Sequence, residues 1–158
     1  MQNKSIKLLC TAILCILTAA VQAVEYDLWV NNERFTSDKL TIQCGPGTAV
    51  FNGTSTLTLN SALITNSCTI DGLGAGIVSR LPALTITINN SVKIDNVVQP
   101  SIITNVWGAG ITTADAPGGS GSEPLRDIVF AGGGPLRIHT TNAVTGYGVY
   151  YTGDSWNR

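Results

Sequence analysis

Two stretches decide the fold: residues 84–94, LTITINNSVKI, and residues 128–138, IVFAGGGPLRI. Each begins with a run in which apolar side chains alternate, as in a β-strand, and each ends with a second run of the same kind. Only three or four small residues separate the two runs. Because Asn and Gly tolerate the left-handed backbone of a sharp corner, both stretches predict a strand, a corner and a second strand. A looser third copy occupies residues 57–64, LTLNSALI.

A second element recurs, in which glycine directly precedes a β-branched residue. Its glycines are Gly76, Gly110 and Gly148, spaced by 34 and 38 residues. Together the two elements predict an all-β fold, a small right-handed parallel β-helix of few coils. In such a helix each coil lays its strands on the coil below and its apolar side chains stack inward. A β-sandwich is the alternative, because its composition is the same and its turn spacing overlaps.

Outside these repeats the chain also favours strands. No window repeats apolar residues with the period of a helix. Residues 26–36 predict an N-terminal β-hairpin with a tight turn at Asn31 and Asn32. Residues 112–126 are rich in Gly, Ser and Pro, which predicts a surface loop between coils.

The first residues predict an export signal. Lys4 and Lys7 give a positive start, residues 8–20 form an apolar run, and small residues follow at the end of the segment. The apolar run is shorter than the ~20 residues that cross a bilayer, so no transmembrane segment is expected. We expect residues 1–23 to be a signal peptide cleaved after Ala23, and the protein to be secreted, periplasmic or at the cell surface.

Removal of that peptide leaves residues 24–158, enough for a single β-helix domain with its own core. Residues 154–158 offer no recognisable closing coil. An uncapped coil exposes strand edges to other chains. We therefore expect either a domain truncated at its C-terminus or an end-to-end association through the last coil.

The charge balance argues against nucleic acid as a partner. The whole chain has a formal net charge of −1; all ten acidic but only seven of the nine basic residues follow Ala23, which gives −3 for the expected mature chain. Lys39 and Lys93 are its only lysines, and no basic cluster is present. A surface with few charges and many hydroxyls and amides suits an exported protein that meets sugars or other surfaces.

Two of the four cysteines, Cys10 and Cys15, fall in the expected signal peptide. The other two, Cys44 and Cys68, favour a disulfide in an oxidising compartment. Closing that loop would stabilise the fold by roughly 3 to 4 kcal/mol on the chain-entropy model. Two buried free thiols are the alternative, whereas a metal pair is disfavoured because no second Cys or His stands near either residue.

No catalytic signature is present. No serine lies in a nucleophile motif, and the glycines of 132–134 lack the Lys-Ser or Lys-Thr of a phosphate loop. Asp71 and Asp95 are about one coil apart and are weak candidates for a calcium site, although such residues more often sit at solvated corners. Arg137 and His139 should share the outward side of one strand, but the sequence places no carboxylate partner beside the histidine.

Sugar binding usually uses flat aromatic faces beside amides and hydroxyls. The candidate ligand-binding residues are Trp107, Tyr150, Tyr151 and Trp156. Trp29 belongs to the first alternating strand, so we expect it to pack as a lid on the coil.

Several of these stretches resemble a known group of proteins. Residues 26–30, 36–37, 56–60 and 127–138 resemble secreted bacterial parallel β-helix proteins that are described as carbohydrate-binding-domain proteins. The resemblance covers most of residues 25–151. It implies a pectate-lyase-like fold without catalytic activity. Some relatives in that group bind acidic plant polysaccharide and calcium.

The sequence thus predicts an exported, non-catalytic carbohydrate-binding or cell-surface protein. A structural or adhesive surface protein without sugar binding is the alternative interpretation, and a polysaccharide lyase is the third. The expected partner is a polysaccharide or a cell-surface component. No cofactor is expected, with calcium as the one candidate.

Overall fold

The computed structural model describes residues 22–70, 73–97, 107–113, 126–141 and 145–150. These residues form strands and turns and no helix, so the prediction of an all-β chain is confirmed for the described part. Among the described residues, no helix is long and apolar enough to cross a membrane.

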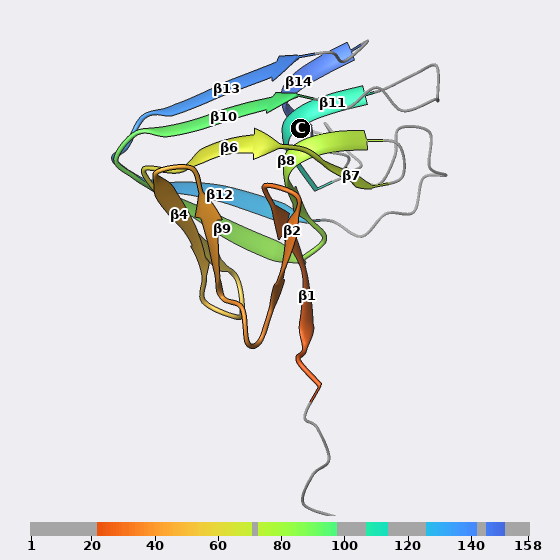
Figure 1. Ribbon diagram of the computed structural model, residues 1–158, viewed down its shortest axis with the longest axis vertical. Helices are drawn as coiled ribbons and strands as arrows, with labels where there is room; N and C mark the ends of the chain where they lie inside the picture. Colours follow the sequence, from red (N-terminus) through yellow and green to blue (C-terminus); the bar gives the residue numbers. More distant parts are fainter. Residues whose placement is uncertain (1–21, 71–72, 98–106, 114–125, 142–144, 151–158) are drawn as a thin grey trace, which may run out of the picture.

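The described chain contains fourteen strands, labelled in chain order in Figure 1. They are β1 (Glu25–Val30), β2 (Glu33–Thr36), β3 (Thr41–Cys44), β4 (Gly47–Phe51), β5 (Thr56–Asn60), β6 (Leu63–Asn66), β7 (Cys68–Ile70), β8 (Leu73–Ser79), β9 (Ala83–Asn89), β10 (Val92–Val97), β11 (Trp107–Thr112), β12 (Asp127–Gly132), β13 (Leu136–Thr141) and β14 (Thr145–Tyr150).

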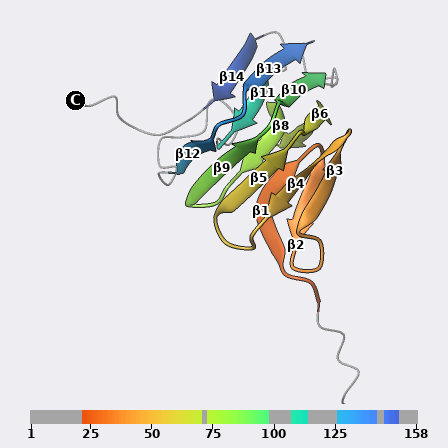
Figure 2. The ribbon, with the colours of Figure 1, turned by 90° about the vertical axis from the view of Figure 1, so that its left-hand side faces the viewer.

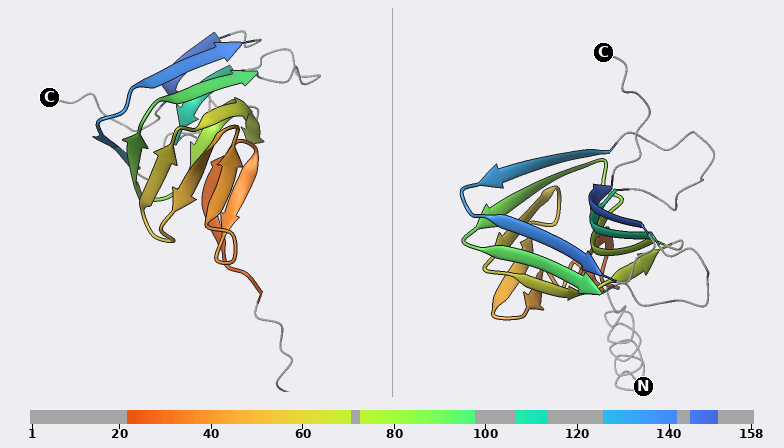
Figure 3. Two further views of the ribbon diagram at one scale, coloured as in Figure 1. Left: turned by 60° about the vertical axis from the view of Figure 1, so that its left-hand side comes forward. Right: turned by 90° about the horizontal axis from the view of Figure 1, so that it is seen from above.

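The strands form three open sheets, two of them mixed. Their strand orders are β14-β11-β8-β1-β2 with β7 beside β8, β13-β10-β6, and β12-β9-β5-β4-β3. Figure 2 shows the last of these sheets with its strands side by side. The right-hand view of Figure 3 shows that strands of the three sheets lie around a shared interior.

One pattern runs through all three sheets. We call β5, β6 and β8 the first layer, β9, β10 and β11 the second layer, and β12, β13 and β14 the third layer. Within each sheet, the strands of successive layers pair in parallel. The chain therefore visits the three sheets in the same order three times.

Apolar side chains of successive layers fall into register on the inner side of the sheets. The aligned positions are Leu57, Ile86 and Phe130 in one sheet, Ile64, Ile94 and Ile138 in the second, and Ile77, Ile111 and Val149 in the third. The side chains of the first two layers at these positions are buried and belong to one core cluster that draws on all three sheets.

The predicted corners are confirmed where the backbone can be followed. Asn90, between β9 and β10, has a φ of 61°, and Gly132, at the end of β12, has a φ of 91°. The recurrent glycine before a β-branched residue serves a different purpose. A Cβ added to Gly76 in β8 would lie 2.7 Å from Cγ2 of Ile94 in β10, so glycine here permits two sheets to approach closely.

Two antiparallel hairpins, β1-β2 and β3-β4, cover the first layer. The predicted hairpin over residues 26–36 is confirmed, with positive φ at Asn31 and Asn32 in its turn. Phe35 and Phe51 from these hairpins are buried, with ring centroids 5.6 Å apart. This end of the core is therefore closed.

The predicted loop over residues 112–126 is too long at both ends. Thr112 belongs to β11, and both Thr113 and Arg126 are buried. Nη1 of Arg126 donates a hydrogen bond of 2.6 Å to the carbonyl oxygen of Thr113. This contact ties the two flanks of the segment to the core, a long-range interaction that local composition does not report.

Candidate functional site

A set of four charged or titratable side chains lies on the outer side of β10 and β13. The two strands pair in parallel, with Lys93 opposite Arg137 and Asp95 opposite His139. Intervening apolar residues face inward, so the alternation of each strand sends these four side chains outward. We call Lys93, Asp95, Arg137 and His139 the charged face. The predicted outward positions of Arg137 and His139 are confirmed, since both are exposed.

Asp95 links the two strands of the charged face. Its Oδ2 accepts a hydrogen bond of 2.7 Å from Nζ of Lys93, and its Oδ1 lies 2.9 Å from Nδ1 of His139. The hydrogen bond from Lys93, and then that from His139, lower the pKa of Asp95 below its ordinary value. An ionised Asp95 can therefore accept a hydrogen bond from the Nδ1–H of His139, and in that tautomer Nε2 of His139 is an acceptor that a ligand can reach.

Sequence reasoning found His139 but missed its carboxylate partner. Asp95 lies 44 residues earlier in the chain, one layer away. The signal was nevertheless present in the repeat, because aligning residues 84–95 with residues 128–139 sets Asp95 opposite His139.

A shallow, open groove adjoins the charged face at the corner between β9 and β10 and between β12 and β13. It encloses about 720 Å³. Its polar lining comes mainly from Asn60, Asn89, Asn90 and Ser91, with Gly133 and Pro135 from the third layer. We call it the corner groove.

Asparagine side chains stack inside the corner groove. Nδ2 of Asn89 donates a hydrogen bond of 3.0 Å to Oδ1 of Asn60 in the layer below. Ser91 and Pro135 each stand two residues before a cation of the charged face, Lys93 and Arg137, respectively. Two strand residues span about 7 Å, so the groove and the charged face are continuous.

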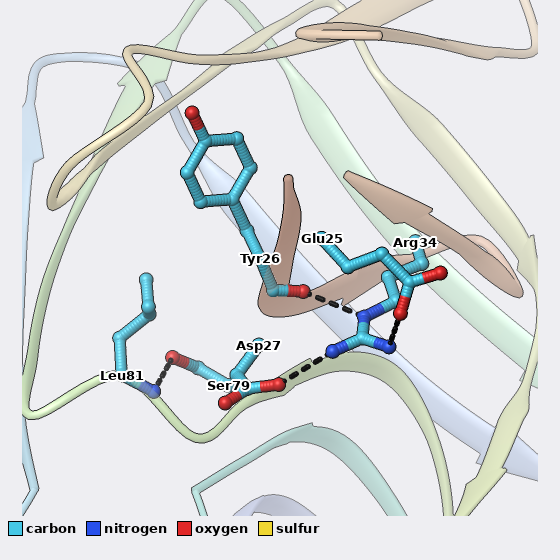
Figure 4. A network of polar contacts seen from close by, with 6 residues as sticks. All are labelled: Glu25, Tyr26, Asp27, Arg34, Ser79 and Leu81. Atoms are coloured by element: carbon cyan, nitrogen blue, oxygen red, sulfur yellow. Dashed lines mark hydrogen bonds and ion pairs between the residues drawn. The ribbon is translucent and has the colours of Figure 1, made fainter. Parts of the chain in front are cut away.

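A second polar cluster, around Arg34, serves the fold (Figure 4). Its Nε donates to the carbonyl oxygen of Tyr26 at 2.8 Å, its Nη2 pairs with Asp27 at 2.7 Å, and its Nη1 pairs with Glu25. The guanidinium also lies 4.8 Å from the ring centroid of Trp29. These contacts hold β1 against β2, and each nitrogen of the guanidinium already donates to an oxygen of β1, so the cluster offers few free donors to a ligand.

Trp29 packs partly buried against Cys68, Ala75, Val78 and Ala109, consistent with the lid predicted for it.

The aromatic candidates for ligand binding do not lie close together along the strands. Trp107 begins β11, whereas Tyr150 pairs with the residue that ends β11, Thr112.

The backbones of Trp107 and Tyr150 therefore lie about 16 Å apart along the strands. Tyr151 and Trp156 lie outside the described residues. Register does not unite Trp107 and Tyr150 in one flat platform.

The calcium candidates gain no support from the described residues. Asp71 lies outside them, and both oxygens of Asp95 already contact nitrogen atoms of neighbouring side chains. Within the described ranges, no group of three or more His, Cys, Asp or Glu side chains could hold a metal ion.

The expected disulfide between Cys44 and Cys68 is absent from the structure, which has two free, buried thiols. Cys44 belongs to the main core cluster, whereas Cys68 packs in the separate cluster beneath Trp29. Sequence spacing could not show that the two residues enter different clusters. Burial raises the pKa of the Cys44 thiol to about 11 and also raises that of Cys68.

A scan against family models, a search of curated proteins and a search of solved structures found no match to this chain.

Proposed function

We propose that this chain is a small parallel β-helix that is exported and binds an acidic polysaccharide without cleaving it. The three-fold repetition of the strand order, with parallel pairing between layers, supports the β-helix. The charged face and the corner groove together form the proposed binding surface.

The observation that carries the proposal is the register of Lys93 and Arg137. They are directly opposite each other on neighbouring parallel strands and point to the same side. The strands are about 4.8 Å apart, so a carboxylate-bearing chain that crosses them meets two cations in succession. The guanidinium can bind a carboxylate through two parallel hydrogen bonds, and the ammonium acts as a point charge beside it.

The corner groove supplies the complementary polar groups. Each Asn side chain offers both a donor and an acceptor, which suits sugar hydroxyls. Asn89 uses one side-chain N–H in its hydrogen bond to Asn60. Its side-chain carbonyl oxygen and its second N–H can bind sugar hydroxyls along the groove. A sugar chain that runs along the charged face into the groove would thus replace water there and form hydrogen bonds with these amide groups.

Affinity electrophoresis in gels that contain polygalacturonate tests this surface. Lys93→Ala and Arg137→Ala should each weaken the retardation about fivefold, because an exposed charge contact contributes about 1 kcal/mol. Lys39→Ala is the matched control, since Lys39 is also exposed and paired with a carboxylate, that of Glu33. Equal binding by all three variants, or equal retardation in a neutral galactan gel, would contradict the proposal.

Asp95→Asn separates direct recognition from a calcium bridge. The substitution removes the negative charge that competes for Lys93, so direct binding to polygalacturonate should strengthen. A calcium-bridged contact would weaken instead, because it would lose a ligand oxygen. A loss of binding would therefore reject direct contact with the cations.

The contact between His139 and Asp95 also favours a second candidate, a polysaccharide lyase. A histidine oriented by a carboxylate is a common general base, and Arg137 lies two residues away on the same strand. A lyase would release unsaturated products that absorb ultraviolet light. His139→Ala would abolish that absorbance in a lyase and would leave glycan retardation largely intact in a binding protein.

A further inference from the structure

The third layer leaves one end of the core open. In each sheet its strand is the outermost one, so β12, β13 and β14 each pair on one side within the described chain. Its inward side chains are Ile128, Phe130, Leu136, Ile138 and Val149, which we call the open end.

Exposure changes sharply between the second and third layers. Phe130 is 46% exposed and Val149 is 43% exposed. The residues beneath them, Ile86 and Ile111, are fully buried. The three other residues of the open end are only partly buried. The described third layer thus presents core side chains to the outside.

The two ends of the described fold are not equivalent. The first layer lies beneath the β1-β2 and β3-β4 hairpins, and its inward residues Leu57, Leu59 and Ile64 are fully buried. A head-to-tail stack would have to displace these hairpins. The open end of one molecule can instead meet the open end of another with no such displacement.

We propose that the open end is a docking surface for a second copy of this chain, in a tail-to-tail dimer. A two-fold axis places the same patch on both sides and closes the assembly at two subunits. The same axis sets the unpaired strands of the two molecules antiparallel, so their free N–H and C=O groups can form hydrogen bonds.

The size of the surface sets the strength of the dimer. Each of the three strands has six residues and is about 20 Å long. Three strands of that length enclose a face of about 170 Å². Even with its rim, this contact is smaller than the ~800 Å² per partner of a standard specific interface. We therefore expect a dissociation constant in the micromolar range, where apolar contact is offset by the cost of association.

Charge does not oppose this contact. The described outward side chains of the third layer include one acidic residue, Asp127, and one arginine, Arg137. His139 on β13 is already paired with Asp95 on β10. Two such surfaces meet without a block of like charges.

Sedimentation equilibrium of the purified chain between about 1 and 300 µM tests the proposal. We expect a monomer–dimer equilibrium that Phe130→Lys and Val149→Lys each weaken at least tenfold. Two variants on different sheets guard against a local folding defect, and circular dichroism checks each. Val129→Lys is the matched control, because Val129 is exposed on the same strand but points outward, and it should leave the equilibrium unchanged.

Three results would overturn the proposal. A protein that stays monomeric at every concentration would overturn it. If such a monomer dimerised after removal of residues 151–158, the occupant of the open end would be the chain's own tail. Mass that grows without limit would show head-to-tail filaments. A dimer that ignores both lysine variants would place the interface elsewhere. None of these results bears on glycan binding, which is measured separately.

Discussion

The glycine triplet at the corner between β12 and β13 makes a strict test of the packing between layers. A Cβ added to Gly134 would lie 1.9 Å from the carbonyl oxygen of Asn90, in the layer below. A Cβ added to Gly132 would lie 2.3 Å from that of Ile88. One added to Gly133 would meet nothing within 4 Å. Alanine at three consecutive positions should therefore have effects of different sign.

The magnitudes follow from these distances. Gly133→Ala restricts the unfolded chain without a clash, so it should stabilise the fold by about 0.4 to 1 kcal/mol. Gly134→Ala forces a backbone oxygen to move and should cost about 1 to 3 kcal/mol, as overpacking does. Gly132→Ala adds to its clash the left-handed φ of 91°, a further cost of about 1 kcal/mol.

Urea unfolding followed by circular dichroism measures the three variants. At constant m, the midpoint should rise for Gly133→Ala and fall for the other two variants. The fall should be larger for Gly132→Ala than for Gly134→Ala. The free energies of unfolding of Gly133→Ala and Gly134→Ala should differ by at least about 1.4 kcal/mol. Midpoints that shift equally for these two variants would refute the close approach of the layers at this corner.

Three further predictions concern the interior and the charged face. Gly76→Ala should lower the free energy of unfolding by about 1 to 3 kcal/mol, because its new methyl group meets Ile94; an unchanged urea midpoint would contradict this packing. In a protein that consists of residues 24–158, Cys44 should resist a thiol reagent at pH 8, because a pKa of about 11 leaves about one thiolate in a thousand molecules. Cys68, whose pKa is also raised, should react slowly as well. Denaturation should then expose two titratable thiols, whereas a disulfide would yield none. The lowered pKa of Asp95 stabilises the fold at pH values above its ordinary 3.8 and loses that contribution as the pH falls through the lowered value. Asp95→Asn should accordingly lower the urea midpoint at pH 7, and the difference from the original protein should shrink as the pH falls through the lowered pKa of Asp95; a difference that does not change with pH would rule out this ionisation as the cause.

Local pattern was sufficient to predict the strands and their corners. Alternation within residues 84–94 reports directly which side chains face inward, and Asn90 adopts the left-handed conformation expected at the corner. The hairpin turn at Asn31 and Asn32 was equally local. These features depend on residues that are neighbours in the chain, so they can be predicted from the sequence.

Features that depend on contacts between layers were harder to predict. Asp95 and His139 meet only because two strands 44 residues apart share a register. Cys44 and Cys68 are both buried, but the sequence does not report that they enter separate clusters. The same limit applies to Arg126, whose hydrogen bond to Thr113 shortens the predicted loop.

The hairpin-covered end gives the molecule a folding polarity. Several of its pairings, within the two hairpins and between β4 and β5, are short in sequence: Thr48 and Asn60 are 12 residues apart, whereas Ile86 and Phe130 in the outer layers are 44 apart. Since short loops close at lower entropic cost, nucleation should begin at the hairpins and proceed strand by strand toward β14. That direction is also the order in which a chain emerges from a ribosome or a translocation pore, so each new strand would find its template already formed.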